Sequence, residues 1–138
     1  MCLQVKKIMH RKYISIFLVA LLVPLGSAVA ADKVIPAEAT ELIRRVHDAA
    51  AKRNFEALKN SMVDEFVWSF GGDGDATQAL KAWNTDPRYL RQLSRVTASS
   101  CVIRTDLVEC PVNAGVGYRA GFKRTNSGWR MIYFVAGD

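Results

Sequence analysis

Apolar residues recur at helical spacing in the first half of the chain, beyond a separate N-terminal segment. Between residues 37 and 52 the recurring residues are Ala39, Leu42, Ile43, Val46, Ala49 and Ala50. A repeat of three or four residues places them on one face, which predicts an amphipathic helix. A shorter helix is expected over residues 55–63, because Asn54 is a favourable N-cap residue.

Alternation of apolar and polar residues replaces this spacing at residues 64–70, "DEFVWSF", and predicts a first strand. The glycine-rich segment "GGDGD" then interrupts the strand, and Asp75 is placed to cap a following helix. Asp86 is a second N-cap candidate, with Pro87 at the first position of another helix.

Strands are expected throughout the remainder of the chain. Residues 101–110, "CVIRTDLVEC", fit a hairpin, and residues 115–124 alternate up to the turn signal "TNSG". Residues 129–138 are apolar on both faces, which is typical of a strand that is central or covered on both sides. Helices followed by strands predict an α+β fold, with N-terminal helices packed on a curved antiparallel sheet.

A cationic front precedes an apolar run at the N-terminus. The cations are Lys6, Lys7, Arg11 and Lys12. The apolar run, residues 14–25, has 12 residues, whereas a membrane-spanning helix needs about 20. Ala28 and Ala30 follow, small residues at the spacing that signal peptidase accepts. Residues 1–30 are therefore predicted to be a signal peptide, and residues 31–138 a single domain in the periplasm or outside the cell.

Removal of this leader changes the charge of the protein. Of 19 basic residues four lie in the leader, so 15 remain against 13 acidic residues, and the net charge falls from +6 to +2. The basic character therefore belongs mainly to export, and nucleic-acid binding is not indicated. No stable membrane anchor is expected after cleavage.

Two of the three cysteines, Cys101 and Cys110, remain in the predicted mature chain. A two-residue loop at Thr105 and Asp106 would place them opposite each other, although this dipeptide fits the tightest hairpin turns poorly and a longer loop is the alternative. An oxidising compartment favours their pairing. Metal and redox roles are disfavoured, because one histidine remains and the chain has no C-x-x-C motif. A structural disulfide is therefore predicted.

The layout of the chain resembles the nuclear transport factor two-like, or cystatin-like, superfamily. The resemblance rests on "ELIRRVHDAAAKRNFEALKNSMVDEFVW" and on the closing "GYRAGFKRTNSGWRMIYFVAGD". It implies a curved antiparallel sheet wrapped around helices, with a cone-shaped cavity. The superfamily includes enzymes, binding domains and proteins without a known ligand, so the resemblance does not imply an activity.

The sequence offers few residues for catalysis. His47 borders the apolar face of the first helix and is the one weak candidate for a general base; a boundary histidine is the alternative. Asp64 and Glu65 are neighbours, so their side chains point apart on a strand. Asp73 and Asp75 lack the spacing of a calcium loop. No catalytic residue, metal site or cofactor is therefore assigned.

Basic residues in the predicted strands are the candidates for binding. They are Arg104, Arg119, Lys123 and Arg130, which alternation can bring to one sheet face. Such a stripe would attract an acidic protein partner or an anionic ligand; a solvated outer face is the alternative. We therefore expect a small exported binding protein, such as an inhibitor or immunity-type protein that blocks a partner. A cavity enzyme, or a protein that binds a small hydrophobic ligand, is the competing hypothesis.

Overall fold

The computed structural model describes residues 33–69 and 74–137. These residues belong to one unit, Asp32–Asp138. The predicted leader and Asp73 lie outside the described residues. Among the residues that are described, no helix is both long enough and apolar enough to span a membrane.

Four helices form in the described part of the chain, in the order that the apolar spacing predicts. They are α1 (Ala37–Ala51), α2 (Phe55–Ser61), α3 (Ala76–Thr85) and α4 (Arg88–Thr97). All six apolar residues expected on the inner face of α1 are buried. Asn54 caps α2 by accepting a hydrogen bond from the Ala57 backbone N–H at 3.0 Å. Asp75 caps α3 through the N–H groups of Thr77 and Gln78, so these two predicted caps satisfy free donors at helix starts. The third prediction is off by one residue: α4 begins at Arg88 with Pro87 as its N-cap, although Asp86 still accepts a hydrogen bond from the Arg88 backbone N–H at 3.0 Å.

The described strands form a single five-stranded sheet. They are β1 (Met62–Val67), β2 (Val102–Arg104), β3 (Leu107–Cys110), β4 (Tyr118–Thr125) and β5 (Gly128–Ala136), in the order β1-β5-β4-β3-β2. The strands β2 to β5 pair antiparallel, as predicted, but β1 pairs parallel with β5. The α+β class is therefore confirmed, with a mixed sheet. Alternation could not reveal this difference, because a period of two is the same in either strand direction.

The strand β5 lies inside the sheet, between β1 and β4, which agrees with its apolar character on both faces. The side chains of β5 do not simply alternate between the two sheet faces, because the register with β4 shifts between the pairs Gly121–Tyr133 and Phe122–Met131. Ile132 is the extra residue of this bulge. As a result Met131 is buried under the helices, whereas Tyr133 points to the opposite face of the sheet.

Several strand boundaries differ from the predicted ones. The strand β1 begins at Met62, within the helix predicted for residues 55–63, and it ends at Val67, so Trp68 and Ser69 lie beyond it. The strand β4 begins at Tyr118, so Val116 of the predicted strand 115–124 precedes it and is 75% exposed. At the end of β1 and before the start of β4, the alternating sequence pattern extends beyond the residues whose backbone pairs with a neighbouring strand.

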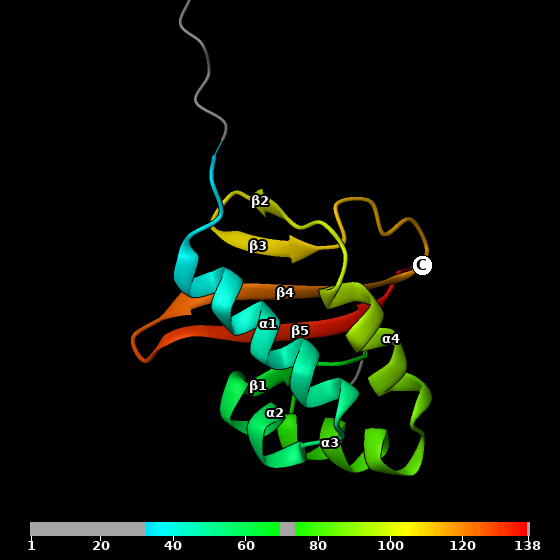
Figure 1. Cartoon of the computed structure of the whole chain (residues 1–138). Coiled ribbons are helices and arrows are strands. Elements are labelled where there is room, and N and C mark those ends of the chain that lie inside the picture. Colours follow the sequence, from blue (N-terminus) through cyan, green and yellow to red (C-terminus); the bar gives the residue numbers. More distant parts are fainter. Residues whose placement is uncertain (1–32, 70–73, 138) are drawn as a thin grey trace, which may run out of the picture. The chain divides into compact units, whose positions relative to one another are not determined.

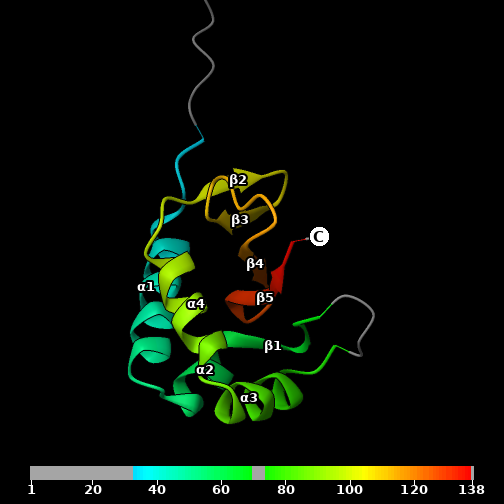
Figure 2. The same ribbon diagram turned by 90° about the vertical axis from the view of Figure 1, so that its right-hand side faces the viewer.

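The helices cover one face of the sheet. In Figure 1, α1 and α4 cross in front of β4 and β5, and Figure 2 shows them on one side of these strands. The core between the two layers contains Trp83, Phe66, Phe122, Phe134 and Met131, all nearly or fully buried. The Trp83 ring meets Phe66 and Phe134 edge to face, with centroids 5.7 and 5.6 Å away. Large aromatic and apolar side chains therefore pack between the helices and the sheet.

The cysteine hairpin forms with the predicted pairing. Its cross-strand pairs are Arg104–Leu107, Ile103–Val108 and Val102–Glu109. Thr105 takes a left-handed backbone conformation, with φ of 48°, which lets the loop stay at two residues. Cys101 and Cys110 are joined by a disulfide with their Cα atoms 4.3 Å apart. That distance suits two residues directly opposite each other in a non-hydrogen-bonded pair, so the predicted disulfide is present.

Candidate binding surface on the sheet

One row of residues crosses the sheet face that the described helices leave open. Cα pairing runs through Val102, Glu109, Gly121, Tyr133 and Val67, one residue from each strand. Paired residues of neighbouring strands point to the same side of a sheet. We call this side the outer sheet face; it carries the row together with Arg104, Arg119, Lys123 and Val135.

Tyr133 and Glu109 are joined across the intervening strand β4. The Tyr133 hydroxyl donates a hydrogen bond to Glu109 Oε2 at 2.5 Å. Burial raises the pKa of Tyr133, and the hydrogen bond to Glu109 raises it further. The hydroxyl therefore remains protonated through neutral and moderately alkaline pH, and it acts as a fixed donor.

Arg119 lies next to this pair, in register with Val135. Its Nε atom is buried and has no hydrogen-bond acceptor among the described residues. Gly137 packs closely on the guanidinium, since a β-carbon at this position would lie 2.6 Å from Arg119 Nη2. A buried donor without an acceptor costs free energy. Nε itself is closed to solvent, so a ligand carboxylate would bind the other N–H groups of the Arg119 guanidinium, which are charged donors.

A hollow of about 250 Å³ brings these groups together. It is lined by Val67, Glu109, Arg119, Tyr133 and Val135. The two valines and the tyrosine ring form apolar walls, and Val67 is 41% exposed. Glu109 is already engaged by Tyr133 and by Arg104, whose Nε lies 3.7 Å from Oε1. The hollow therefore offers a guanidinium and apolar contacts for recognition, but its carboxylate is not free to act as a general base.

The predicted basic residues do not form one uncompensated cationic stripe. Arg104, Lys123 and Arg130 occupy one cross-strand row, beside the row that contains Tyr133. Arg104 is close to Glu109, and Lys123 forms an ion pair with Asp106. The hydrogen bond from Lys123 also lowers the pKa of Asp106. Much of the expected positive charge is thus compensated within the face.

Arg130 departs from the expected position. Its backbone is in register with Lys123, but its side chain lines a separate hollow beside α1 and α2. The strand β1 begins opposite Met131, so no β1 residue is paired beside Arg130 to hold its side chain over the outer sheet face. Arg119 is therefore the basic residue of that face for which the described residues show no ion pair.

His47 connects two helices instead of facing either hollow. Its Nδ1 lies 2.9 Å from the Ser94 carbonyl oxygen, which joins α1 to α4. A carbonyl oxygen can only accept, so Nδ1 carries the proton. The nearest other partners of this nitrogen are the hydroxyl groups of Ser94 and Thr97. None of these contacts of Nδ1 is a carboxylate, and they join α1 to α4.

The acidic candidates also have structural surroundings. Asp64 and Glu65 are exposed on β1, and Asp64 Oδ1 lies 3.5 Å from Lys59 Nζ. Asp75 is occupied as the cap of α3, and hydrogen bonds from Gln78 and Thr77 lower the pKa of its carboxyl. Within residues 33–69 and 74–137, no three histidine, cysteine or acidic side chains gather as metal ligands.

Sequence reasoning missed Glu109 and Tyr133 as members of the site. Glu109 could have been placed opposite Val102 from the cysteine hairpin alone. Tyr133 could not, because the bulge at Ile132 determines which face it occupies. The contact between them requires the registers of three strands, which are set by residues far apart in the sequence.

Gly121 gives a direct test of this geometry. A β-carbon at Gly121 would lie 2.8 Å from Tyr133 Cδ1 and nearer still to two other ring atoms. Gly121→Ala is therefore expected to displace the ring, to break the bond to Glu109 and to lower the free energy of unfolding by about 1–2 kcal/mol. Chemical denaturation gives the free energy, and the ultraviolet absorbance of tyrosine during alkaline titration reports the hydroxyl. An unchanged titration curve in the folded variant would show that Tyr133 is not held as described.

Comparisons with known proteins find distant structural similarity but no matching family model or curated protein. An NTF2-like protein of unknown function from Pseudomonas putida is 12% identical, with a TM-score of 0.46 over 70% of this chain and 81% of that one. An NTF2-like protein with a cystatin-like fold from Novosphingobium aromaticivorans is 23% identical, with a TM-score of 0.41 over 72% and 79%.

A third similar structure, an NTF-2 like protein of unknown function from Shewanella oneidensis, is 9% identical, with a TM-score of 0.45 over 73% of this chain and 97% of that one. NTF2 denotes nuclear transport factor two. At these identities and TM-scores, no argument about this chain rests on the matches. The function is therefore argued from the residues of this chain.

Proposed function

We propose that the protein is an exported binding protein, which holds a partner protein on the outer sheet face and acts without catalysis. The observation that carries the proposal is the position of Arg119, whose buried Nε lacks an acceptor among the described residues beside apolar walls. Arginine and tyrosine surrounded by apolar contacts are typical of the residues that contribute most to protein interfaces.

The disulfide supports the export that this proposal includes. Disulfides form and persist in oxidising compartments such as the bacterial periplasm, and they are rare in the cytosol. The basic and apolar pattern of residues 1–30 supports the same location. A finer version of the proposal is an inhibitor or immunity-type protein, which would act by covering the functional surface of its partner.

The partner that fits this face presents a carboxylate beside an apolar side chain. The carboxylate would accept hydrogen bonds from Arg119, and the apolar group would pack against Val67 and Val135. A purely electrostatic attraction is weaker than the sequence predicts, because Arg104 and Lys123 already have acidic neighbours.

Replacement of Arg119 tests the proposal. Arg119→Ala is expected to weaken partner binding at least about tenfold, because the partner carboxylate would lose its charged hydrogen-bond donor. Arg95→Ala is the matched control, since Arg95 is exposed on α4. The tagged proteins would be used to capture the partner from cell-envelope extract, and the dissociation constant would then be measured with the purified partner.

The outcomes separate the two hypotheses for function. Equal binding by the wild type and both variants, with circular dichroism confirming the fold, would contradict a site at Arg119. His47→Ala should leave binding unchanged, because His47 contacts α4 and not the outer sheet face. Loss of activity in a folded His47→Ala protein, with normal activity of Arg119→Ala, would instead favour the cavity enzyme.

A further inference from the structure

A second hollow lies between α1, α2 and the beginning of β5. It measures about 560 Å³ and shares no lining residue with the hollow of the outer sheet face. We call it the basic groove, defined by Arg44, Arg45, Lys52, Asn60 and Arg130. Three of these residues come from α1 and its C-terminal end, and Arg130 comes from β5. The groove is thus built by segments that are far apart in the sequence.

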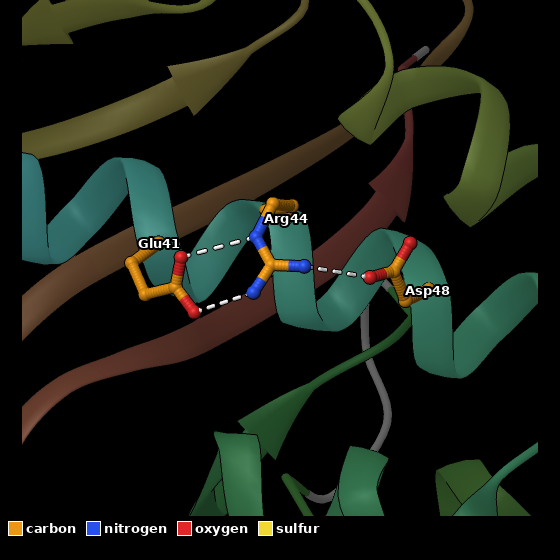
Figure 3. A network of polar contacts seen from close by, with 3 residues as sticks. All are labelled: Glu41, Arg44 and Asp48. Atoms are coloured by element: carbon orange, nitrogen blue, oxygen red, sulfur yellow. Dashed lines mark hydrogen bonds and ion pairs between the residues drawn. The ribbon is translucent and has the colours of Figure 1, made fainter.

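Arg44 is held in place by two carboxylates along α1. Figure 3 shows its guanidinium between Glu41 and Asp48. The Nη2 and Nε atoms donate to Glu41 at 2.7 and 3.0 Å, and Nη1 donates to Asp48 at 3.0 Å. The hydrogen bonds from Arg44 lower the pKa of Glu41. The charge of Arg44 is therefore compensated, and the Glu41 carboxylate remains ionised near neutral pH.

The other three cations of the basic groove have no such partner. Arg45, Lys52 and Arg130 take part in none of the ion pairs that the described residues form. Arg130 donates from Nη1 to the Trp129 carbonyl oxygen at 2.8 Å, which leaves its other N–H groups available. The acids of the Arg44 network do not cancel these charges, since four cations face two carboxylates.

Neighbouring side chains make the basic groove rich in donors. Asn60 is exposed and adds an amide donor, whereas the Ser61 hydroxyl is occupied as a donor to the Ala57 carbonyl oxygen. Arg130 also borders a hollow with Asp64, but Asp64 lies 3.5 Å from Lys59 instead. Asp48 also lines the basic groove, but its carboxylate is paired with Arg44 at 3.0 Å. The guanidinium groups of Arg45 and Arg130, the Lys52 ammonium and the Asn60 amide therefore face a common space in which the one acidic lining residue is already engaged.

We propose that the basic groove binds a phosphate group. A phosphate carries more charge than a single carboxylate and has more acceptor oxygens, so it can engage several donors at once. Arginine offers a planar pair of donors for two oxygens, while lysine adds a point charge. The groups around the hollow match that requirement: they are the side chains of Arg45, Arg130, Lys52 and Asn60. Arg44 lies on the side of the hollow towards Glu41.

A purely structural role accounts for Lys52 but not for the whole set. Lys52 follows the last turn of α1, where a cation is favourable beside the negative end of the helix dipole. Arg45 lies within the helix, and Arg130 belongs to a strand. Neither of these residues is explained by the helix end, and their convergence with Lys52 is the observation on which the phosphate site rests.

Pyrophosphate is a suitable probe of the site. We expect saturable binding at low ionic strength, measured by calorimetry and by amide shifts of residues around the groove. Lys52→Gln with Arg130→Gln should weaken binding at least about tenfold, because two charged donors are lost. The matched control is Lys81→Gln with Arg95→Gln, which removes the same two residue types at exposed positions on α3 and α4. Far-ultraviolet circular dichroism and the Lys52→Gln single variant guard against a folding defect.

The same variants identify the source of the phosphate. Vesicles of phosphatidylglycerol are compared with soluble pyrophosphate. Groove-dependent binding of pyrophosphate alone supports a soluble ligand, and groove-dependent capture of vesicles supports a lipid headgroup. Equal affinity of the groove variant and the control variant for both probes would overturn the proposal, because binding would then depend on net charge alone.

Discussion

Replacing Trp83 with alanine is expected to lower the free energy of unfolding by about 3–5 kcal/mol. Trp83 is the largest fully buried side chain, and its ring contacts Phe66 and Phe134 edge to face. The substitution removes these contacts and leaves a cavity that the surrounding sheet and helices can fill only in part. For a domain of this size, such a loss is a large share of the total stability.

Trp83→Phe is the informative control. The indole Nε1 has no acceptor among the described residues, so its removal takes away no hydrogen bond to them. The smaller ring keeps much of the packing, and we expect a loss below about 1.5 kcal/mol. Denaturant titrations of the wild type and both variants provide the comparison. If Trp83→Phe were as destabilising as Trp83→Ala, an unrecognised polar contact of Nε1 would have to be part of the fold.

Reduction of the Cys101–Cys110 disulfide is expected to cost about 2–3 kcal/mol. The bond closes a loop of ten residues, and its removal gives the unfolded chain more conformations. For a domain of about 100 residues, this loss corresponds to a fall of about 10 °C or more in the thermal midpoint. Thermal unfolding of the wild type with and without a reductant measures the effect.

The double variant Cys101→Ala with Cys110→Ala distinguishes the cross-link from side-chain packing. Cys110 is fully buried, so its truncation should add a further loss that reduction alone does not cause. The midpoint of the double variant should not respond to the reductant. A wild-type midpoint that is equally insensitive, with both thiols shown to be free, would mean that the hairpin does not need the cross-link.

The helices could be predicted almost residue by residue, because their signals are local. Spacing within α1 identified its buried face, and Asn54 and Asp75 marked the starts of α2 and α3. The cysteine hairpin was equally accessible, since its loop and both cysteines lie within residues 101–110. In each of these cases, the residues that determine the structure are neighbours in the chain.

The strand pairing of the sheet and the composition of its outer face are determined by contacts between residues that are far apart in the sequence. The parallel pairing of β1 with β5 joins Met62 to Met131, and no local pattern specifies that partner or its direction. Because of the bulge at Ile132, Met131 and Tyr133 lie on opposite faces of the sheet, whereas alternation along β5 places them on the same face. The four basic residues could be named from the sequence. Their compensation by Glu109 and Asp106, and the different position of Arg130, required the strand registers.

The position of β5 between β1 and β4 has a consequence for the order of folding. During synthesis, α1 and β1 leave the ribosome well before β5, the last described strand in the chain. Until β5 emerges, β1 has no strand to pair with and β4 lacks one of its two neighbours. Contacts between distant segments form slowly, because the loop entropy must be overcome first. The domain should therefore remain unfolded while it is being made, which is the state that passage through a protein-conducting channel requires.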